Sequence, residues 1–208
     1  MDLKSKLFDR RVCERISHEE SNAADQLAIE LLSLFPAATS RPIVFVCIGT
    51  DRSTGDSLGP LVGTFLEEKK LPSFFVYGTL DDPIHAVNLH DQLKWIKERH
   101  FHPFIIGIDA CLGRFKSVGM IEVGEGSVKP GAGVNKDLPA VGHIHVTGIV
   151  NVSGFMEFFV LQNTRLNLVL KMAKTIANGI YKANLSYPQQ PNWPGYSWKT
   201  GKTEAAEQ

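Results

Sequence analysis

The sequence predicts an α/β fold of three layers, in which a doubly wound, mostly parallel sheet is flanked by helices. The first observation is a set of short apolar runs, rich in β-branched and aromatic residues, at residues 43–48, 74–80 and 104–108. Such runs are typical of strands that are buried on both faces of a parallel sheet. The second is that amphipathic stretches of helical period separate the runs, at the length that βαβ crossovers need. The third is that carboxylates follow the runs, where open α/β sheets bind their ligands.

Composition limits the classes of protein to which the chain can belong. With 208 residues and 43% hydrophobic content, the chain can form one domain with a sizeable core. Its 22 basic and 22 acidic residues give a net charge of zero, so composition predicts no nucleic-acid partner and no binding to an anionic membrane surface. No apolar signal region and no run of membrane-spanning length is visible. We therefore expect a cytoplasmic protein.

We divide the chain into three parts. Residues 1–16 are mixed and charged without a clear period, which predicts an N-terminal extension. Residues 17–185 form the predicted single α/β domain. Residues 186–208 are rich in Pro, Gly and polar residues, which predicts an extended or disordered tail. The tail also carries Trp193 and Trp198, which could pack on the domain or on a partner.

The elements of the domain can be assigned in order along the chain. Ser17 can cap a first helix, which ends before Pro36. Between the strands already named, helices are predicted over residues 58–70 and 84–100. The second half of the domain is predicted to contain a strand at 118–123, a long glycine-rich loop at 124–142, a strand at 143–150, and a helical region at 153–184 that is broken near Asn163 and Thr164.

Two aspartates stand out as candidate catalytic residues. Asp56 follows the first apolar strand, and Asp109 directly follows the third. A doubly wound sheet makes these strands neighbours, so both side chains could face the crevice at the carboxyl edge. Two close carboxyl groups cannot both ionise without a cost in electrostatic energy. One therefore keeps its proton while the other is ionised, which gives an acid and a base in one site. The alternative is that Asp56 only caps a helix and that Asp109 is only a turn residue.

The loop after the first strand offers further polar groups. Asp51, Arg52 and Ser53 lie at the same strand end and are candidate substrate-binding residues. The loop reads GTDRSTGDSLG, which could also be considered as a phosphate cradle. It lacks the ending of a P-loop and does not match the dinucleotide-binding pattern, and Asp56 would repel a phosphate. We therefore favour the site of paired carboxylates over a phosphate site.

The glycine-rich loop is the third candidate part of the site. Its centre reads PGAGVNKDLP and contains Gly131, Gly133 and Asn135. Glycines at these positions would let backbone N–H groups approach a substrate carbonyl, so we list all three as candidate substrate-binding residues. An ordinary flexible surface loop is the alternative.

The histidines and cysteines do not form a metal pattern. His143 and His145 alternate on a predicted strand and could join Asp56 and Asp109 as ligands, but no known ligand spacing is present. Cys111 lies near Asp109, yet nothing in the local sequence supplies a base to activate it. We predict no metal and no cofactor, and we keep a metal-dependent hydrolase as an alternative.

Three motifs resemble those of a known family. TGDSLGP resembles the TPDALGP element of the bacterial spore germination protease, IIGIDACLGR resembles its strand ending IDAL, and VKPGAGVNKDL resembles its ISPGSGVGNKR element. The motifs occur in the same order and span roughly residues 43–150. Over nearly its full length, the chain resembles the YyaC-type sporulation proteins, which are related to that protease and share the fold of the hydrogenase maturation proteases.

The resemblance implies roles for particular residues. Asp56 and Asp109 correspond to the two essential aspartates of the germination protease, and residues 131–135 correspond to the glycine loop beside them. In the hydrogenase maturation proteases the two aspartate positions bind nickel together with a histidine. That histidine is missing near residues 131–133 in this chain.

These inferences together predict a sporulation-associated peptidase. Its partner would be a peptide or protein substrate, and its location the cytoplasm, including the forespore or spore interior. The first alternative is a binding or regulatory protein that kept the protease fold without its activity, and the second is the metal-dependent hydrolase. Homo-oligomer formation is left open.

Overall fold

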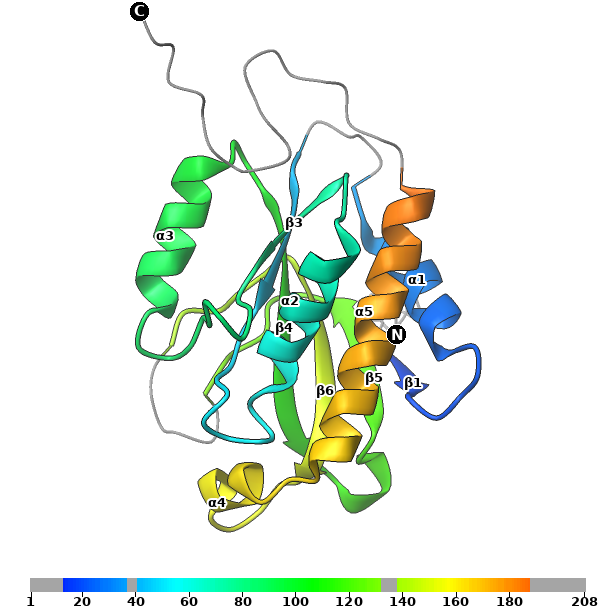
Figure 1. The fold of residues 1–208 in the computed structure, drawn as a ribbon, viewed down its shortest axis with the longest axis vertical. Helices are drawn as coiled ribbons and strands as arrows, with labels where there is room; N and C mark the ends of the chain where they lie inside the picture. The colour runs from blue at the N-terminus through cyan, green and yellow to red at the C-terminus, as the bar shows by residue number, and fades with distance from the viewer. Residues whose placement is uncertain (1–12, 37–40, 132–137, 188–208) are drawn as a thin grey trace, which may run out of the picture.

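A computed structural model describes residues 13–36, 41–131 and 138–187. A six-stranded sheet lies at its centre, with the strand order β1-β5-β6-β4-β2-β3 (Figure 1). The strands are β1 (Cys13–Ser17), β2 (Ile43–Cys47), β3 (Phe74–Tyr77), β4 (Phe104–Gly113), β5 (Met120–Glu125) and β6 (Ile144–Val152). The helices are α1 (Ala23–Leu34), α2 (Leu58–Lys69), α3 (Leu89–Arg99), the 3-10 turn η1 (Phe115–Ser117), α4 (Glu157–Gln162) and α5 (Leu166–Ser186).

The centre of the sheet is parallel and one side of it is mixed. Strand β2 pairs in parallel with both β3 and β4, and β4 pairs in parallel with β6. On the far side of β6, β5 is antiparallel, and β1 is antiparallel to β5. The predicted α/β class with a mostly parallel sheet is therefore confirmed.

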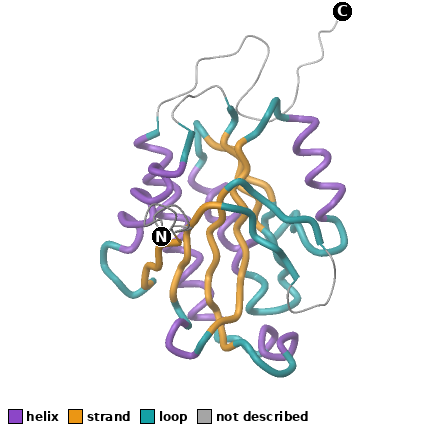
Figure 2. Tube along the Cα trace, turned by 180° about the vertical axis from the view of Figure 1, so that it is seen from behind, coloured by secondary structure: helices purple, strands orange, loops and turns teal. Residues whose placement is uncertain are grey.

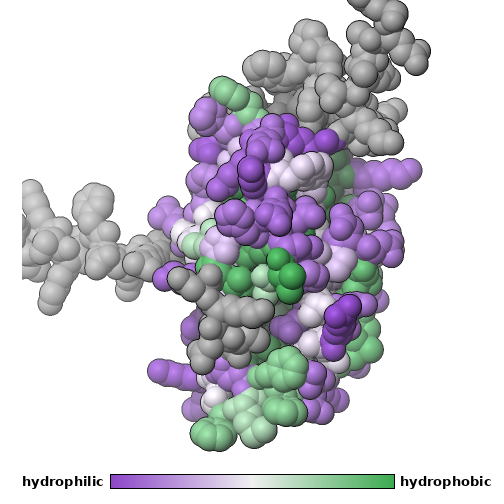
Figure 3. All heavy atoms as spheres, turned by 90° about the vertical axis from the view of Figure 1, so that its left-hand side faces the viewer, coloured by the Kyte–Doolittle hydropathy of each residue, from purple (hydrophilic) through white to green (hydrophobic). Residues whose placement is uncertain are grey.

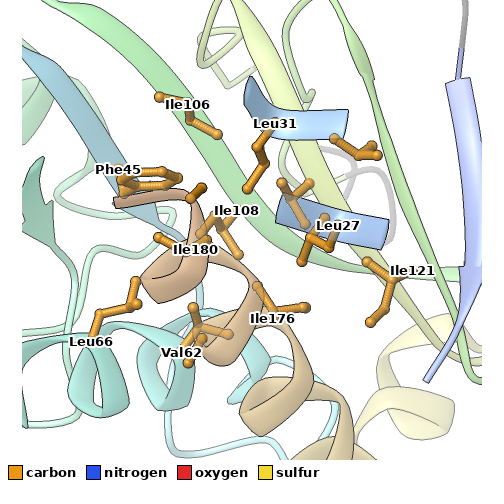
Figure 4. Packing of buried hydrophobic residues seen from close by; sticks show 14 of the residues in the cluster. Leu27, Leu31, Phe45, Val62, Leu66, Ile106, Ile108, Ile121, Ile176 and Ile180 are labelled. Atoms are coloured by element: carbon orange, nitrogen blue, oxygen red, sulfur yellow. The ribbon is translucent and has the colours of Figure 1, made fainter. Parts of the chain in front are cut away.

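Both faces of the sheet are covered, which makes the three predicted layers. Alternate residues of β2 point to opposite faces: Phe45 packs in the core shared with α1, α2 and α5, whereas Val44 and Val46 pack in the core shared with α3. Figure 4 shows the larger core, where Leu27 and Ile176 meet between α1 and α5. From behind, Figure 2 shows the other face, which is covered by α3 and by loops.

The amino-terminal part of the described chain differs from the prediction. Residues 13–16, which the sequence assigned to an extension, belong to β1, and the first helix begins at Ala23 rather than just after Ser17. The cause is an edge pairing with β5 that local sequence cannot show: Ile16 is buried, and the Arg15 guanidinium is 2.6 Å from the Glu122 carboxylate. Residues 1–12 and the tail from 188 lie outside the described residues.

Two element boundaries near the carboxyl edge also differ from the prediction. Helix α3 begins at Leu89 instead of near residue 84, because the Asn88 side chain holds a turn by accepting the backbone N–H of His85 and donating to the carbonyl of Pro83, at 2.8 and 3.0 Å. Strand β4 runs on to Gly113 beside β6, so Asp109 lies within a strand rather than after one.

The predicted break in the last helical region is present. Helix α4 ends at Gln162 with Asn163 as its C-cap, and α5 starts at Leu166. None of the helices in the described ranges is long and apolar enough to cross a membrane.

Candidate active site

The two candidate aspartates line one pocket, at the point where the winding of the sheet changes direction. Strand β2 lies between β3 and β4, and the crossovers to these two strands run over opposite faces. Pairing of β2 with β4 ends at Cys47 and Ile108, after which β2 leaves the sheet while β4 continues. Asp109 is the next residue of β4, on the same face as Ile105. Its side chain therefore faces the crevice that β2 leaves open, as the doubly wound topology predicts.

Close backbone contact brings Asp56 back to the end of β2. The backbone N–H of Thr50 donates to the carbonyl of Asp56 at 3.2 Å. At Gly49 φ is +146°, and a Cβ there would lie 1.9 Å from the same carbonyl oxygen. Only glycine fits this approach. Ser57, not Asp56, occupies the N-cap position of α2, so the Asp56 side chain is left to line the pocket.

A pocket of about 490 Å³ contains both aspartates. Of the predicted substrate-binding residues, Asp51, Arg52 and Gly131 also line it. Ser53 does not: it is buried, and its hydroxyl lies beside Asp56. Gly133 and Asn135 lie outside the described residues. The rest of the wall is largely apolar and comes from the start of the glycine-rich loop, the turn before α3, the end of β4, and α4.

The two carboxyl groups have different protonation behaviour. Burial raises the pKa of Asp109 to about 8, against a 2.8 Å hydrogen bond from the Ala110 N–H, and the negative charge of Asp56 raises it further. Burial also raises the pKa of Asp56, while the Ser53 hydroxyl opposes that rise. At neutral pH Asp109 is therefore mainly protonated. Such a pair can supply a general acid and a general base at one place.

His85 is a pocket residue that the sequence prediction missed. It lies in the turn that precedes α3, and its Nδ1 accepts the backbone N–H of Val87 at 3.3 Å. The turn is attached to the aspartate loop, because the Gly49 N–H donates to the carbonyl of Ile84 at 2.8 Å. The sequence does contain a signal for this turn. Asn88 is a good helix N-cap, which would start the helix after residue 88 and leave His85 in the segment that follows β3. The prediction failed because it extended the helix back over residues 84–88.

Helix α4 supplies a second set of residues that the sequence did not indicate. Glu157, Phe158 and Leu161 line the pocket that contains the two aspartates. The sequence placed these residues in a longer helical region, and nothing in their spacing suggests that they return to the carboxyl edge of β2 and β4.

The first part of the glycine-rich loop lines the pocket. Val128 and Val141 form a closed pair, each backbone N–H donating to the other's carbonyl at 2.9 Å. Lys129, Pro130 and Gly131 follow on the pocket side. The pairing fixes where the loop starts relative to the aspartates, and its central residues 132–137 lie outside the described residues.

Cys111 shares the pocket but does not have the properties of an activated nucleophile. It lies two residues beyond Asp109 on the same strand. Burial raises the pKa of its thiol to about 12, although the Thr147 hydroxyl opposes that rise. The thiol stays protonated at physiological pH, whereas nucleophilic cysteines need a lowered pKa.

The histidines considered as metal ligands lie elsewhere. His143 precedes β6 at the opposite edge, where it stacks on Phe104 and its ring contacts Arg41 at 3.1 Å. The ring of His145 contacts the carbonyl of Gly126 at 3.1 Å, and neither histidine lines the pocket. The hypothesis that one of them joins the aspartates is therefore wrong, because β6 runs parallel to β4 and its early residues lie before the site. Within residues 13–36, 41–131 and 138–187, no three His, Cys, Asp or Glu side chains are grouped to hold a metal.

Fold and site together define an α/β protein with two carboxyl groups at the switch point of its sheet. The chain belongs to the family described as "Protein of unknown function (DUF1256)", which matches residues 15–179. It is 58% identical over 182 residues to "Uncharacterized protein YyaC" of Bacillus subtilis (strain 168), covering 86% of this chain and 89% of that relative. The predicted resemblance to YyaC-type proteins is thus confirmed at the level of sequence.

A solved structure of similar fold is the [NiFe] hydrogenase maturation protease HycI from Thermococcus kodakarensis KOD1. The TM-score is 0.49 and the sequence identity 17%, with 74% of this chain and 98% of that chain covered.

Proposed function

We propose that this protein is a peptidase that hydrolyses peptide bonds with Asp56 and Asp109. The observation that carries the proposal is a pocket in which Asp109 has a pKa of about 8 beside the second carboxyl group of Asp56. A carboxylic acid that keeps its proton at neutral pH, next to a carboxylate, is the arrangement that acid–base hydrolysis requires.

The proposed reaction starts with Asp56 ionised and Asp109 protonated. Asp56 removes a proton from a water molecule, whose oxygen attacks the carbonyl carbon of the peptide bond. Asp109 gives its proton to the carbonyl oxygen, so that the tetrahedral intermediate carries no net charge. As the C–N bond breaks, the proton on Asp56 passes to the leaving nitrogen and a hydroxyl proton of the intermediate returns to Asp109. The products are a carboxylic acid and an amine, and both aspartates regain their starting states.

The rim of the pocket provides groups for binding the substrate backbone. Asp51 and Arg52 are exposed on one side, and Lys129 and Gly131 lie at the start of the glycine-rich loop. Gly131 has a φ of +77°, which glycine adopts without strain. We propose that these residues hold an extended peptide across the aspartates, with Gly133 and Asn135 adding backbone and side-chain contacts.

The biological setting is part of the same proposal. The TGDSLGP, IDACLG and KPGAGVN motifs resemble those of the spore germination protease, and that resemblance implies that Asp56 and Asp109 correspond to its essential aspartates. We therefore place the activity in a sporulating cell, in the cytoplasm or the forespore, with a protein as its substrate.

The test is cleavage of a pool of peptides, including those from small spore proteins, with new termini detected by mass spectrometry. We expect cleavage by the wild type and by the control Asp91→Asn, whose side chain is exposed on α3. Asp56→Asn and Asp109→Asn should each lower the rate by roughly 10²- to 10⁴-fold. Full activity of Asp109→Asn would contradict the proposal. Peptide binding by a wild type that never cleaves would favour the binding or regulatory protein instead.

A further inference from the structure

Helix α4 and the two residues before it, Phe155 and Met156, expose an unusual number of large apolar side chains. No residue of the helix is buried. Phe155 is 93% exposed, and Met156, Phe158 and Phe159 are each about half exposed. Contiguous apolar surface of this kind is uncommon on a protein that has no use for it. Figure 3 shows hydrophobic surface gathered at the lower end of the molecule, where α4 lies in Figure 1.

The helix is held firmly against the loop that carries Asp56. The Gly55 N–H donates to the carbonyl of Leu161 at 2.8 Å, and the Asn151 side chain donates to the carbonyl of Val160 at 3.2 Å. The Thr164 hydroxyl donates to the Val160 carbonyl at 2.9 Å. These hydrogen bonds fix the backbone of α4 before any ligand binds. Binding therefore costs little entropy for ordering the helix.

The exposed surface of α4 is continuous with the wall of the aspartate pocket. Phe158 and Leu161 line the pocket that contains Asp56 and Asp109. The same wall includes Val87, which is 80% exposed. A chain bound over α4 would therefore contact apolar side chains of the pocket that contains the two aspartates.

The charges of the pocket disfavour an acidic ligand. Three formal negative charges at Asp51, Asp56 and Glu157 stand against two positive charges at Arg52 and Lys129. With Asp109 protonated, a small negative excess remains, so an acidic side chain is disfavoured and the apolar part of the wall is left to bind an apolar one. A rigid aromatic side chain such as Phe158 is well suited to bind another apolar side chain.

We propose that α4 forms a substrate subsite that takes an aromatic or large aliphatic side chain from an extended protein segment, next to the bond presented to the aspartates. Phe158 contacts that side chain, and Phe155 and Phe159 receive the apolar residues that flank it. The cleavage step rests on the proposed peptidase function, but the binding does not.

The test measures binding in the Asp109→Asn background, so that no peptide is consumed. Fluorescent peptides differ at one central position, which carries Phe, Leu or Asp, and their affinities are measured by anisotropy. We expect the Phe and Leu peptides to bind at least tenfold more tightly than the Asp peptide. Adding Phe158→Ala should remove about tenfold of the apolar affinity. The matched control is Phe101→Ala, an 80% exposed phenylalanine just before β4 at the opposite edge, which should change affinity less than twofold.

The outcomes separate this inference from the proposed function. Equal effects of Phe158→Ala and Phe101→Ala, or equal binding of the Asp and Leu peptides, would overturn the subsite even if peptides are cleaved. Binding that depends on Phe158, with no cleavage by the wild type, would support the subsite and contradict the proposed peptidase function. Concentration-dependent self-association that Phe158→Ala abolishes, without peptide binding, would assign the surface to a second copy of the chain and overturn the inference.

Discussion

The backbone N–H of Gly55 donates a 2.8 Å hydrogen bond to the carbonyl oxygen of Leu161, which joins the Asp56 loop to α4. The contact is so close that a Cβ on Gly55 would lie 2.7 Å from a methyl group of Leu161 and 3.0 Å from its carbonyl oxygen. The position of one proposed catalytic group thus depends on a helix that lies about a hundred residues further along the chain.

We expect Gly55→Ala to separate α4 from the aspartate loop. The added methyl group should cost about 1–3 kcal/mol in the free energy of unfolding, as overpacking of a closed contact usually does. Denaturant unfolding gives that cost, and hydrogen exchange at the Gly55 position and in α4 shows where the structure loosens. A stable variant with wild-type exchange in α4 would mean that the contact does not couple the two segments.

Gly49→Ala should be more damaging than Gly55→Ala. Its Cβ would meet the backbone of Asp56 at 1.9 Å, and φ at this position is +146°, so both sterics and backbone conformation oppose a side chain. We expect a loss of about 3 kcal/mol or more in the free energy of unfolding, together with loss of peptide cleavage. Thermal unfolding and the cleavage assay measure these two effects. Wild-type stability in Gly49→Ala would contradict the loop geometry.

Stability should depend on pH through Asp109. Its pKa rises from the ordinary 3.8 to about 8 on folding, so the folded state holds the proton more tightly than the unfolded state between these values. The group's contribution is favourable below pH 4 and is lost as pH rises through 8. Asp109→Asn removes the ionisable group, so the variant should gain stability relative to wild type as pH increases, by on the order of a few kcal/mol.

Melting temperatures of wild type and Asp109→Asn at pH 5, 7 and 9 check this prediction. The control is Asp91→Asn, the same substitution at an exposed position of α3 outside the pocket. A constant difference for Asp109→Asn as well would show that Asp109 titrates normally in the folded protein.

The rate of cleavage should fall at alkaline pH. Asp109 has to hold a proton to act as the acid, so kcat/KM should decrease above its pKa of about 8. At lower pH the rate should also decrease as Asp56 becomes protonated, which gives a bell-shaped profile. A rate that continues to rise through pH 9 and 10 would point to a thiolate or a hydroxide nucleophile instead.

Local sequence was sufficient for the parts of the fold that depend on local pattern. The run around Phe45 is apolar on both faces, so a central parallel strand could be predicted, and βαβ spacing then made β2 and β4 neighbours. That step brought Asp56 and Asp109 to the same edge. The edge strand around Ile16 could not be found, because it is specified by its pairing with β5, where Ile16 lies opposite Ile121, rather than by its own alternation.

Only the site residues that follow a predicted strand could be predicted from the sequence. The pocket residue Phe158 comes from a six-residue helix that packs on a loop through Gly55, a long-range contact with no local signature. Ser53 lies between the exposed Arg52 and the half-buried Thr54, yet it is itself buried, and nothing in the local sequence distinguishes it from these neighbours. His143 looked available for the site because alternation indicates a face of the sheet but not a position along the strand.

The most direct test of the paired carboxyl groups is the titration of Asp109, followed by the NMR resonance of its side-chain carboxyl carbon. In the wild type we expect a pKa near 8. In Asp56→Asn we expect a lower pKa that is still above 3.8, because the charge of Asp56 is gone while burial remains. Titration of Asp109 near 4 in both proteins would contradict the account, since the site would then hold no acid at neutral pH.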